Sequence, residues 1–114
     1  MSTVYKILPA SQWRDAERDG AFHGALVDIS DGFIHFSTAE QVAETAAKHF
    51  AGQADLVLLH VDAGRLGARL KWEPSRGGAL FPHFYGALDL AAVIRVDPLP
   101  LSADGRHQFP PLDA

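Results

Sequence analysis

Residues 55–62, DLVLLHVD, constrain the fold of this chain more than any other segment. The run is almost continuously apolar and too short for an ordinary helix, which predicts a strand buried on both faces. Such a strand needs cover on both sides, so we expect it to lie centrally in a sheet. The chain has 114 residues, of which 47% are hydrophobic. We therefore expect one domain over residues 1–114, with an irregular, proline-punctuated tail from about residue 102.

Shorter strands are predicted around this central one, in runs rich in β-branched and aromatic residues. These runs cover residues 4–8, 69–73, 80–85 and 90–96. Pro9, Pro74 and Pro98 are expected to end strands, because proline cannot donate to a strand ladder. Residues 62–67 are typical of a turn or a single helical turn.

Helices are predicted early in the chain. The first follows Pro9, with Ser11 as its N-cap and Gly20 as its left-handed stop. The second covers residues 38–50, where Glu44 and Lys48 have ion-pair spacing. Its apolar stripe is Val42, Ala43, Ala46, Ala47 and Phe50. Residues 21–31 lack periodicity and are expected to form a loop with a binding role. Strands thus outnumber two early helices, which favours the α+β class.

Composition excludes several classes of function. A formal net charge of -4, with basic residues scattered along the chain, gives no patch for duplex nucleic acid. Cysteine is absent, which excludes disulfides, thiol catalysis and thiolate metal sites. No apolar run approaches the roughly 18 residues that span a bilayer. We therefore expect a soluble cytoplasmic protein without a membrane partner.

Residues 32–37, GFIHFS, are the first candidate site. In an extended strand Phe33, His35 and Ser37 share one face. An imidazole there can donate to a sugar hydroxyl, and the serine hydroxyl can orient the adjacent backbone. The alternatives are a hydrogen-bonded core histidine and a capping box in which Ser37 pairs with Glu40.

Residues 80–86, LFPHFYG, are the second candidate site. Phe81, His83 and Tyr85 alternate along this run, close to Arg76 and a flexible glycine pair. Aromatic walls with a histidine and a phenol suit stacking on a planar ring. The alternative is a hydrophobic strand edge whose tyrosine hydroxyl reaches water.

Two weaker candidates contain acids. Glu73 follows Trp72, and an acid beside a large aromatic ring can have a raised pKa and act as a general base. A surface glutamate is the alternative. His60 and Asp62 form a His-x-Asp pair that can bind a metal with His35 or His83, although a buried histidine at a strand end explains the pair as well. The chain has no P-loop, dinucleotide fingerprint or Gly-x-Ser-x-Gly elbow.

The strings DGFIHFST and LKWEPSRGGALFPHFYGAL, with a VYKI start before a Trp-containing helix, resemble a small bacterial family. It is number nine-five-two in the domain-of-unknown-function series, and the resemblance covers residues 4–99. The family is thought to resemble the ADP-ribosyltransferase fold. The resemblance therefore implies a compact domain with a split, mostly antiparallel sheet around an NAD-binding cleft.

The resemblance also implies roles for individual residues. His35 and Ser37 match the His-x-Ser motif that meets the nicotinamide riboside, and Tyr85 resembles the stacking aromatic. The last strand has no glutamate, which leaves Glu73 or Asp97 as substitutes. The implied catalytic residues are His35, Tyr85 and Glu73, and the implied ligand-binding residues are His35, Ser37, Arg76, His83 and Tyr85.

These features predict binding of NAD or an ADP-ribose-related nucleotide, without a metal. As an enzyme, such a protein would carry out ADP-ribosyl transfer or N-glycosidic bond cleavage. The alternative is a non-catalytic ligand-binding or interaction domain. A lesser alternative is a metal site of His35, His60 and His83.

Overall fold

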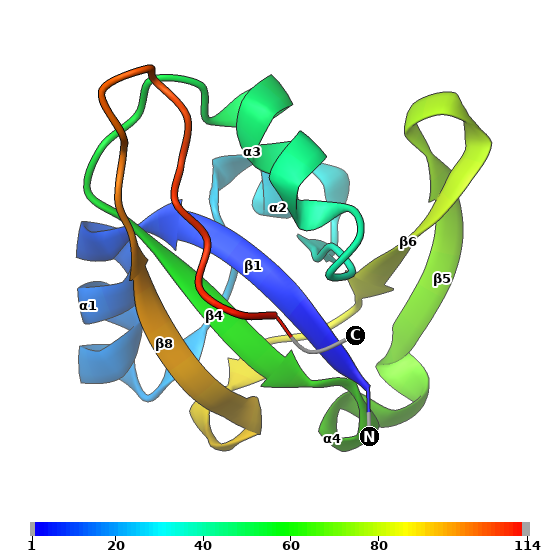
Figure 1. Cartoon of the computed structure of the whole chain (residues 1–114). Helices are drawn as coiled ribbons and strands as arrows, with labels where there is room; N and C mark the ends of the chain where they lie inside the picture. Colours follow the sequence, from blue (N-terminus) through cyan, green and yellow to red (C-terminus); the bar gives the residue numbers. More distant parts are fainter. Residues whose placement is uncertain (1, 113–114) are drawn as a thin grey trace.

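The computed structural model describes residues 2–112, apart from the side chain of Arg76. The helices and strands follow one another along the chain as labelled in Figure 1. The strands are β1 (Thr3–Pro9), β2 (Ala21–Phe22), β3 (Ile34–His35), β4 (Leu56–Asp62), β5 (Leu70–Ser75), β6 (Ala79–Phe84), β7 (Leu88–Asp89) and β8 (Val93–Leu99). The α-helices are α1 (Ala10–Asp19), α2 (Leu26–Asp31), α3 (Val42–His49) and α4 (Ala63–Leu66), and single 3-10 turns occupy Gly67–Arg69, Arg76–Gly78 and Leu90–Ala92.

The strands form separate antiparallel sheets, which confirms an α+β domain. The long sheet has the order β1-β4-β8, and the short sheet has the order β3-β6-β5. A minor pair, β2-β7, lies beside them. One isolated bridge joins the long sheet to the segment after β3: the amides of Tyr5 and Ser37 each donate to the other's carbonyl, at 2.8 and 2.9 Å. The β5-β6 hairpin extends away from the long sheet (Figure 1).

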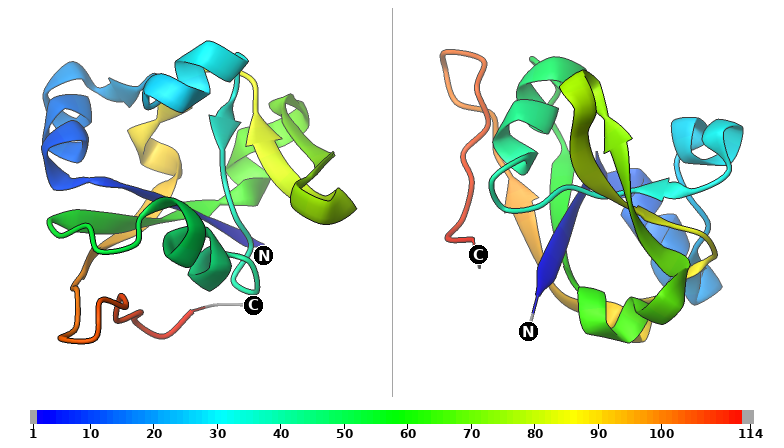
Figure 2. Two further views of the ribbon diagram at one scale, coloured as in Figure 1. Left: turned by 90° about the horizontal axis from the view of Figure 1, so that it is seen from above. Right: turned by 90° about the vertical axis from the view of Figure 1, so that its right-hand side faces the viewer.

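The predicted central strand is confirmed. β4 lies between β1 and β8, and Leu58, Leu59 and Val61 in it are fully buried. Leu59 and Val61 pack into a core that includes Ala16 of α1, whereas Leu58 packs into a second core that includes Val42 of α3. Helices α1 and α3 therefore cover opposite faces of the long sheet, as the view from above shows (Figure 2).

The first helix ends as predicted but begins differently. Gly20 closes α1 in the left-handed conformation, with φ 83°. Ser11 lies inside the helix rather than at its N-cap, so that part of the prediction is wrong. The amide of Ala10, the first helical residue, donates to the carbonyl of Asp55 at 2.8 Å. A tertiary hydrogen bond thus satisfies the donor that a side-chain cap would otherwise serve.

The predicted loop over residues 21–31 is wrong, because the segment contains β2 and α2. Helix α2 has no apolar stripe facing the core: Leu26, Val27 and Ile29 are 85%, 57% and 65% exposed. The buried carboxylate of Asp28 instead accepts from the amide of Ala25 at 2.7 Å, which holds the start of the helix. Helix α2 therefore forms around a polar contact, which leaves no periodic pattern in the sequence.

The predicted second helix is α3, which begins at Val42 rather than at residue 38. The expected capping box of Ser37 and Glu40 is absent. An equivalent pair forms one residue later: Thr38 N donates to Gln41 Oε1 at 3.0 Å, and Gln41 N donates to Thr38 Oγ1 at 3.2 Å. The stripe is partly wrong as well, since Ala43 and Ala47 are exposed. The predicted ion pair of Glu44 and Lys48 is confirmed on the surface, at 3.3 Å.

The later elements shift by a few residues. Pro74 lies inside β5, where an edge strand tolerates proline, rather than ending it. β8 begins at Val93 because Leu90–Ala92 form a 3-10 turn capped by the side chain of Asp89. In the tail, Phe109 and Leu112 pack against the second core without forming a helix or strand. Among the described residues, no helix is long and apolar enough to cross a bilayer.

Candidate functional site

A cavity of about 560 Å³ lies between β1, α2, α3 and the short sheet. This volume falls within the range of roughly 300–1,000 Å³ that is usual for ligand pockets. The rings that line it are Tyr5, Phe36, Phe50, Phe81, His35, His49 and His83. Its other polar lining side chains are Lys6, Gln12, Asp31, Ser37, Thr45 and Ser75. The cavity thus combines aromatic walls with polar groups, as small-molecule sites do.

A buried carboxylate, Asp28 of α2, holds one wall of the cavity together. Its side chain is 1% exposed and pairs with Lys6 Nζ of β1 at 2.9 Å. It also accepts from the backbone amide of His35 at 3.0 Å and contacts the His35 ring Nδ1 at 2.6 Å. One side chain therefore ties α2, β1 and β3 together.

Charge and hydrogen bonding set the ionisation of this cluster. Burial alone would raise the pKa of Asp28, but the hydrogen bond from His35 and the charge of Lys6 outweigh it and lower that pKa to about 2. Burial lowers the pKa of Lys6, and the attraction of Asp28 opposes the change. Asp28 is therefore a carboxylate at neutral pH that only accepts hydrogen bonds.

Both ring nitrogens of His35 contact carboxylates. Nδ1 lies 2.6 Å from Asp28, and Nε2 lies 2.9 Å from Asp31 Oδ2 at the end of α2. The Asp31 side chain is 46% exposed, so a ligand can reach this second pair. His35 is thus held by hydrogen bonds, as the alternative interpretation of a hydrogen-bonded histidine predicted. It is also part of the cavity wall.

A second histidine stands beside the first, because His35 and His83 are register partners across β3 and β6. Their ring centroids are 5.5 Å apart, and the rings meet edge to face. Phe33 stacks on the His83 ring at 4.1 Å and lies 4.6 Å from the His35 ring. The alternation in GFIHFS therefore places Phe33 and His35 on the same face, as predicted.

The His83 ring is anchored by Glu73 of β5. Nδ1 lies 2.9 Å from Glu73 Oε1, and the Tyr85 hydroxyl donates to the same oxygen at 2.7 Å. The hydrogen bonds of Tyr85 and His83 lower the pKa of Glu73, which corrects the expected raised pKa. Trp72 is 46% exposed. The hydrogen bond to Glu73 in turn raises the pKa of Tyr85.

The predicted site residues occupy different places. His35, Ser37 and His83 line the cavity, whereas Glu73 and Tyr85 lie behind His83 and outside the lining. The Ser37 hydroxyl is 2.8 Å from the Thr45 hydroxyl rather than capping a helix. The side chain of Arg76 lies outside the part of the chain that the structure describes.

The expected pairing of His60 with Asp62 is wrong. His60 Nε2 lies 2.8 Å from Asp97 Oδ2, across β4 and β8, while Asp62 accepts from the amide of Gly64. His60 is therefore a buried histidine of the long sheet, as the alternative interpretation of the His-x-Asp pair predicted. Within residues 2–112, no group of three or more His, Asp or Glu side chains is placed to hold a metal ion.

Sequence reasoning missed Lys6, Asp28 and Asp31 as site residues. One signal was present, since Lys6 interrupts the apolar strand VYKIL and so needs a buried partner. Asp28 and Asp31 lie in a segment without periodicity, where nothing indicates which acids turn inward. Their partners come from strands distant in sequence.

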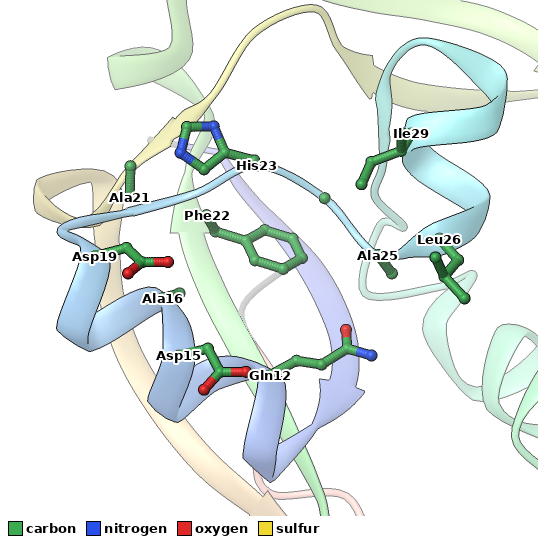
Figure 3. A pocket seen from close by; sticks show the side chains of 11 residues that line it. Gln12, Asp15, Ala16, Asp19, Ala21, Phe22, His23, Ala25, Leu26 and Ile29 are labelled. Atoms are coloured by element: carbon green, nitrogen blue, oxygen red, sulfur yellow. The ribbon is translucent and has the colours of Figure 1, made fainter.

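A smaller cavity of about 230 Å³ lies between α1 and α2 (Figure 3). Phe22 and Ile29 form its apolar walls, and Asp15, Asp19 and His23 add polar groups. Gln12, Ala25 and Leu26 line both cavities. The adjacent histidines His35 and His83 line the larger cavity alone.

Comparison with solved structures finds a close match in sequence and in fold. The crystal structure of protein CC0527 from Caulobacter crescentus is 54% identical, with a TM-score of 0.90 over 94% of each chain. The solution NMR structure of the same protein is 55% identical, with a TM-score of 0.85 over 95% of this chain and 93% of that one. A search of curated proteins finds no significant match. The family model described as "Protein of unknown function (DUF952)" matches residues 7–96, so the chain belongs to the DUF952 family.

Proposed function

We propose that the larger cavity binds a nucleotide of the NAD or ADP-ribose class. The observation that carries this proposal is the pair of adjacent histidines, His35 and His83, on the wall of a cavity of about 560 Å³ that also holds aromatic rings. A ribosylated heterocycle needs hydrogen-bonding groups for its hydroxyls and apolar walls for its ring. This cavity offers both.

The ribose is assigned to His35 and Asp31. A ribose diol can donate to the half-exposed carboxylate of Asp31 and accept from the imidazole, taking the place of their direct contact at 2.9 Å. The hydroxyls of Ser37 and Thr45 also line the cavity and can bind further sugar oxygens. The planar ring would lie against the apolar side, where Phe81 and Phe50 are exposed to the cavity.

The ADP-ribosyltransferase-like fold is part of the same proposal. The split between the long and short sheets, joined by the bridge of Tyr5 and Ser37, supports it, as does the place of the cavity beside that bridge. In this arrangement Tyr85 acts behind His83 rather than by stacking on the ligand, because its hydroxyl is directed to Glu73.

Isothermal titration calorimetry with ADP-ribose, NAD and nicotinamide tests the proposal. Asp31→Asn, at a half-exposed position, keeps the side-chain shape but removes the charge that accepts from the diol. A hydrogen bond to a charged group is worth about 1.5–3 kcal/mol, so we expect roughly tenfold to hundredfold weaker ADP-ribose binding. His35→Ala should weaken binding further, with circular dichroism to check that the fold survives.

His23→Ala is the matched control. His23 is exposed and lines only the smaller cavity, so this variant should bind ADP-ribose like the wild type. If none of the three compounds binds, or if Asp31→Asn binds ADP-ribose as tightly as the wild type, the proposed site is wrong. Weaker binding in His23→Ala alone would move the ligand to the smaller cavity.

A further inference from the structure

We propose that His83 is the general base of the larger cavity, and that it activates a water molecule to hydrolyse an N-ribosyl bond. The substrate class rests on the proposed function, whereas the assignment of the base rests on the geometry of His83 and its neighbours. Glu73, Tyr85 and Phe33 are positioning residues for this imidazole.

The contact with Glu73 determines which nitrogen carries the proton. The Glu73 carboxylate has a lowered pKa and already accepts from Tyr85 at 2.7 Å, so it is ionised and can only accept. The 2.9 Å contact with His83 therefore requires a proton on Nδ1. In the neutral ring this leaves the lone pair on Nε2, the atom that a general base needs.

The ring is held in one orientation. His83 is 5% exposed, and Phe33 stacks on it with ring centroids 4.1 Å apart and planes inclined by 28°. Glu73 is itself held by the Tyr85 hydroxyl. The imidazole lines the cavity, and its Nε2 has no hydrogen-bond partner within the part of the chain that the structure describes. A carboxylate behind a histidine whose other nitrogen faces a ligand is the arrangement that hydrolases use to orient a base.

The neighbouring histidine cannot take this role. His35 contacts Asp28 through Nδ1 and Asp31 through Nε2, so a carboxylate already occupies each of its nitrogens and neither is open to a water molecule. The two imidazoles therefore have different roles. His35 binds the ribose as a donor, and His83 removes a proton.

The water oxygen bonds to the anomeric carbon of the ribose, and one water proton passes to Nε2 of His83. The bond from that carbon to the ring nitrogen breaks, and its electron pair leaves with the heterocycle. For NAD the products are ADP-ribose and neutral nicotinamide, and the proton on His83 is released to solvent.

The first experiment measures nicotinamide release from NAD. Removal of a general base typically costs 10²- to 10⁴-fold in rate, so we expect such a loss in kcat for His83→Gln at saturating NAD. Glu73→Gln should lose a smaller factor, and Tyr85→Phe, which leaves the carboxylate in place, a smaller one still. His23→Ala, outside the cavity, should keep the wild-type rate.

The second experiment determines the tautomer and the reactivity of the His83 imidazole without measuring catalysis. Long-range proton–nitrogen NMR of the full chain should show the Nδ1–H tautomer of His83, and Glu73→Gln should lose that fixed pattern. Diethyl pyrocarbonate should modify His83 faster than His60, which is buried at 3% exposure with its Nε2 beside Asp97. A Nε2–H tautomer, or a His83 that reacts no faster than His60, would overturn the assignment.

The outcomes separate the two proposals. NAD binding without nicotinamide release, or release at the wild-type rate in His83→Gln, refutes the catalytic role of His83 and leaves the binding site standing. If no nucleotide binds, the proposed function is wrong, and the tautomer and modification rates still decide whether His83 is built as a base.

Discussion

The long sheet and the cavity-facing side of the short sheet depend on different contacts. In the long sheet β4 is buried on both faces, and apolar side chains such as Leu58 and Leu59 meet two separate cores. The short sheet presents polar rings, His35 and His83, on the face that borders the cavity, and carboxylates hold them. Apolar packing supports the scaffold, whereas directed polar contacts build the candidate site.

Asp28 and Glu73, two of the carboxylates of the site, also differ. Asp28 is buried at 1% side-chain exposure and needs Lys6 to offset the cost of burial, while Glu73 is 36% exposed and can be solvated. The first therefore couples the site to folding, and the second adjusts a side chain with little effect on the fold. The following predictions test this contrast.

The largest effect is expected from Lys6→Met. The variant leaves the Asp28 carboxylate buried without its cation, which typically costs about 3–5 kcal/mol of unfolding free energy. Urea denaturation measures the loss. Lys6→Met combined with Asp28→Asn should cost less than the sum of the single variants, because the uncompensated charge is gone. Additive losses would show that Lys6 and Asp28 are not energetically coupled.

Leu59→Ala tests the apolar side of the comparison. Leu59 is fully buried in β4, so the cavity it leaves should lower the unfolding free energy by about 2–5 kcal/mol, with no dependence on pH. The matched control is Leu80→Ala in β6, where the side chain is 53% exposed and the loss should stay within about 0.5 kcal/mol. Similar losses in both variants would contradict the contrast between the sheets.

Acid should lower the unfolding free energy through the polar contacts of Asp28. The pKa of Asp28 falls from 3.8 to about 2 on folding, so its contribution to stability is complete above pH 3.8 and is lost as the pH falls through that value toward 2. The shift corresponds to about 2 kcal/mol. Unfolding free energies measured along this range should fall less steeply in Asp28→Asn than in the wild type. An unchanged slope would remove Asp28 from the acid response.

Gly24→Ala should destabilise the α2 region more than Gly20→Ala. Both glycines have positive φ, at 118° and 83°, so alanine is strained at each by about 1–2 kcal/mol. Only at Gly24 would the new Cβ meet another atom, at 2.8 Å from Asp28 Cβ, whereas nothing lies within 4 Å at Gly20. Thermal unfolding of the two variants compares them. Equal losses would mean that Asp28 can shift, contrary to its role as a fixed anchor.

The smallest effect is expected at the exposed carboxylate. The hydrogen bond to Glu73 favours the neutral phenol and raises the Tyr85 pKa above 10.0, so Glu73→Gln should let this tyrosine ionise at lower pH. Tyrosinate absorbance follows the titration, and Tyr85→Phe identifies the signal against that of Tyr5. A phenol that titrates unchanged would show that the hydrogen bond is not maintained in solution.

Strand alternation predicted part of the site correctly. It placed Phe33 with His35, and His83 with Tyr85, on shared faces, and the structure bears out both pairs through ring contacts and the common partner Glu73. Alternation could not show that Tyr85 turns away from the cavity. That orientation depends on Glu73, which lies 12 residues away on a different strand.

Helix boundaries were predicted less well, for a related reason. The residues that follow Ser37 match a helix-capping pattern. The backbone of Ser37 instead forms hydrogen bonds with Tyr5, and its hydroxyl contacts the hydroxyl of Thr45. Helix α2 has no amphipathic pattern and exists around the side chain of Asp28. Local propensity competes with such long-range hydrogen bonds and loses where they are buried.

Local sequence patterns are enough to predict the scaffold: the buried central strand, the surrounding short strands, the glycine stop of α1 and the side-by-side pattern of polar and aromatic residues near His35 and His83. These follow from burial and periodicity, which each segment carries locally. Which acid pairs with which base depends on the folded chain. Asp28 and Lys6 are 22 residues apart, and a buried charge selects its partner by proximity in the folded chain, which no local pattern encodes.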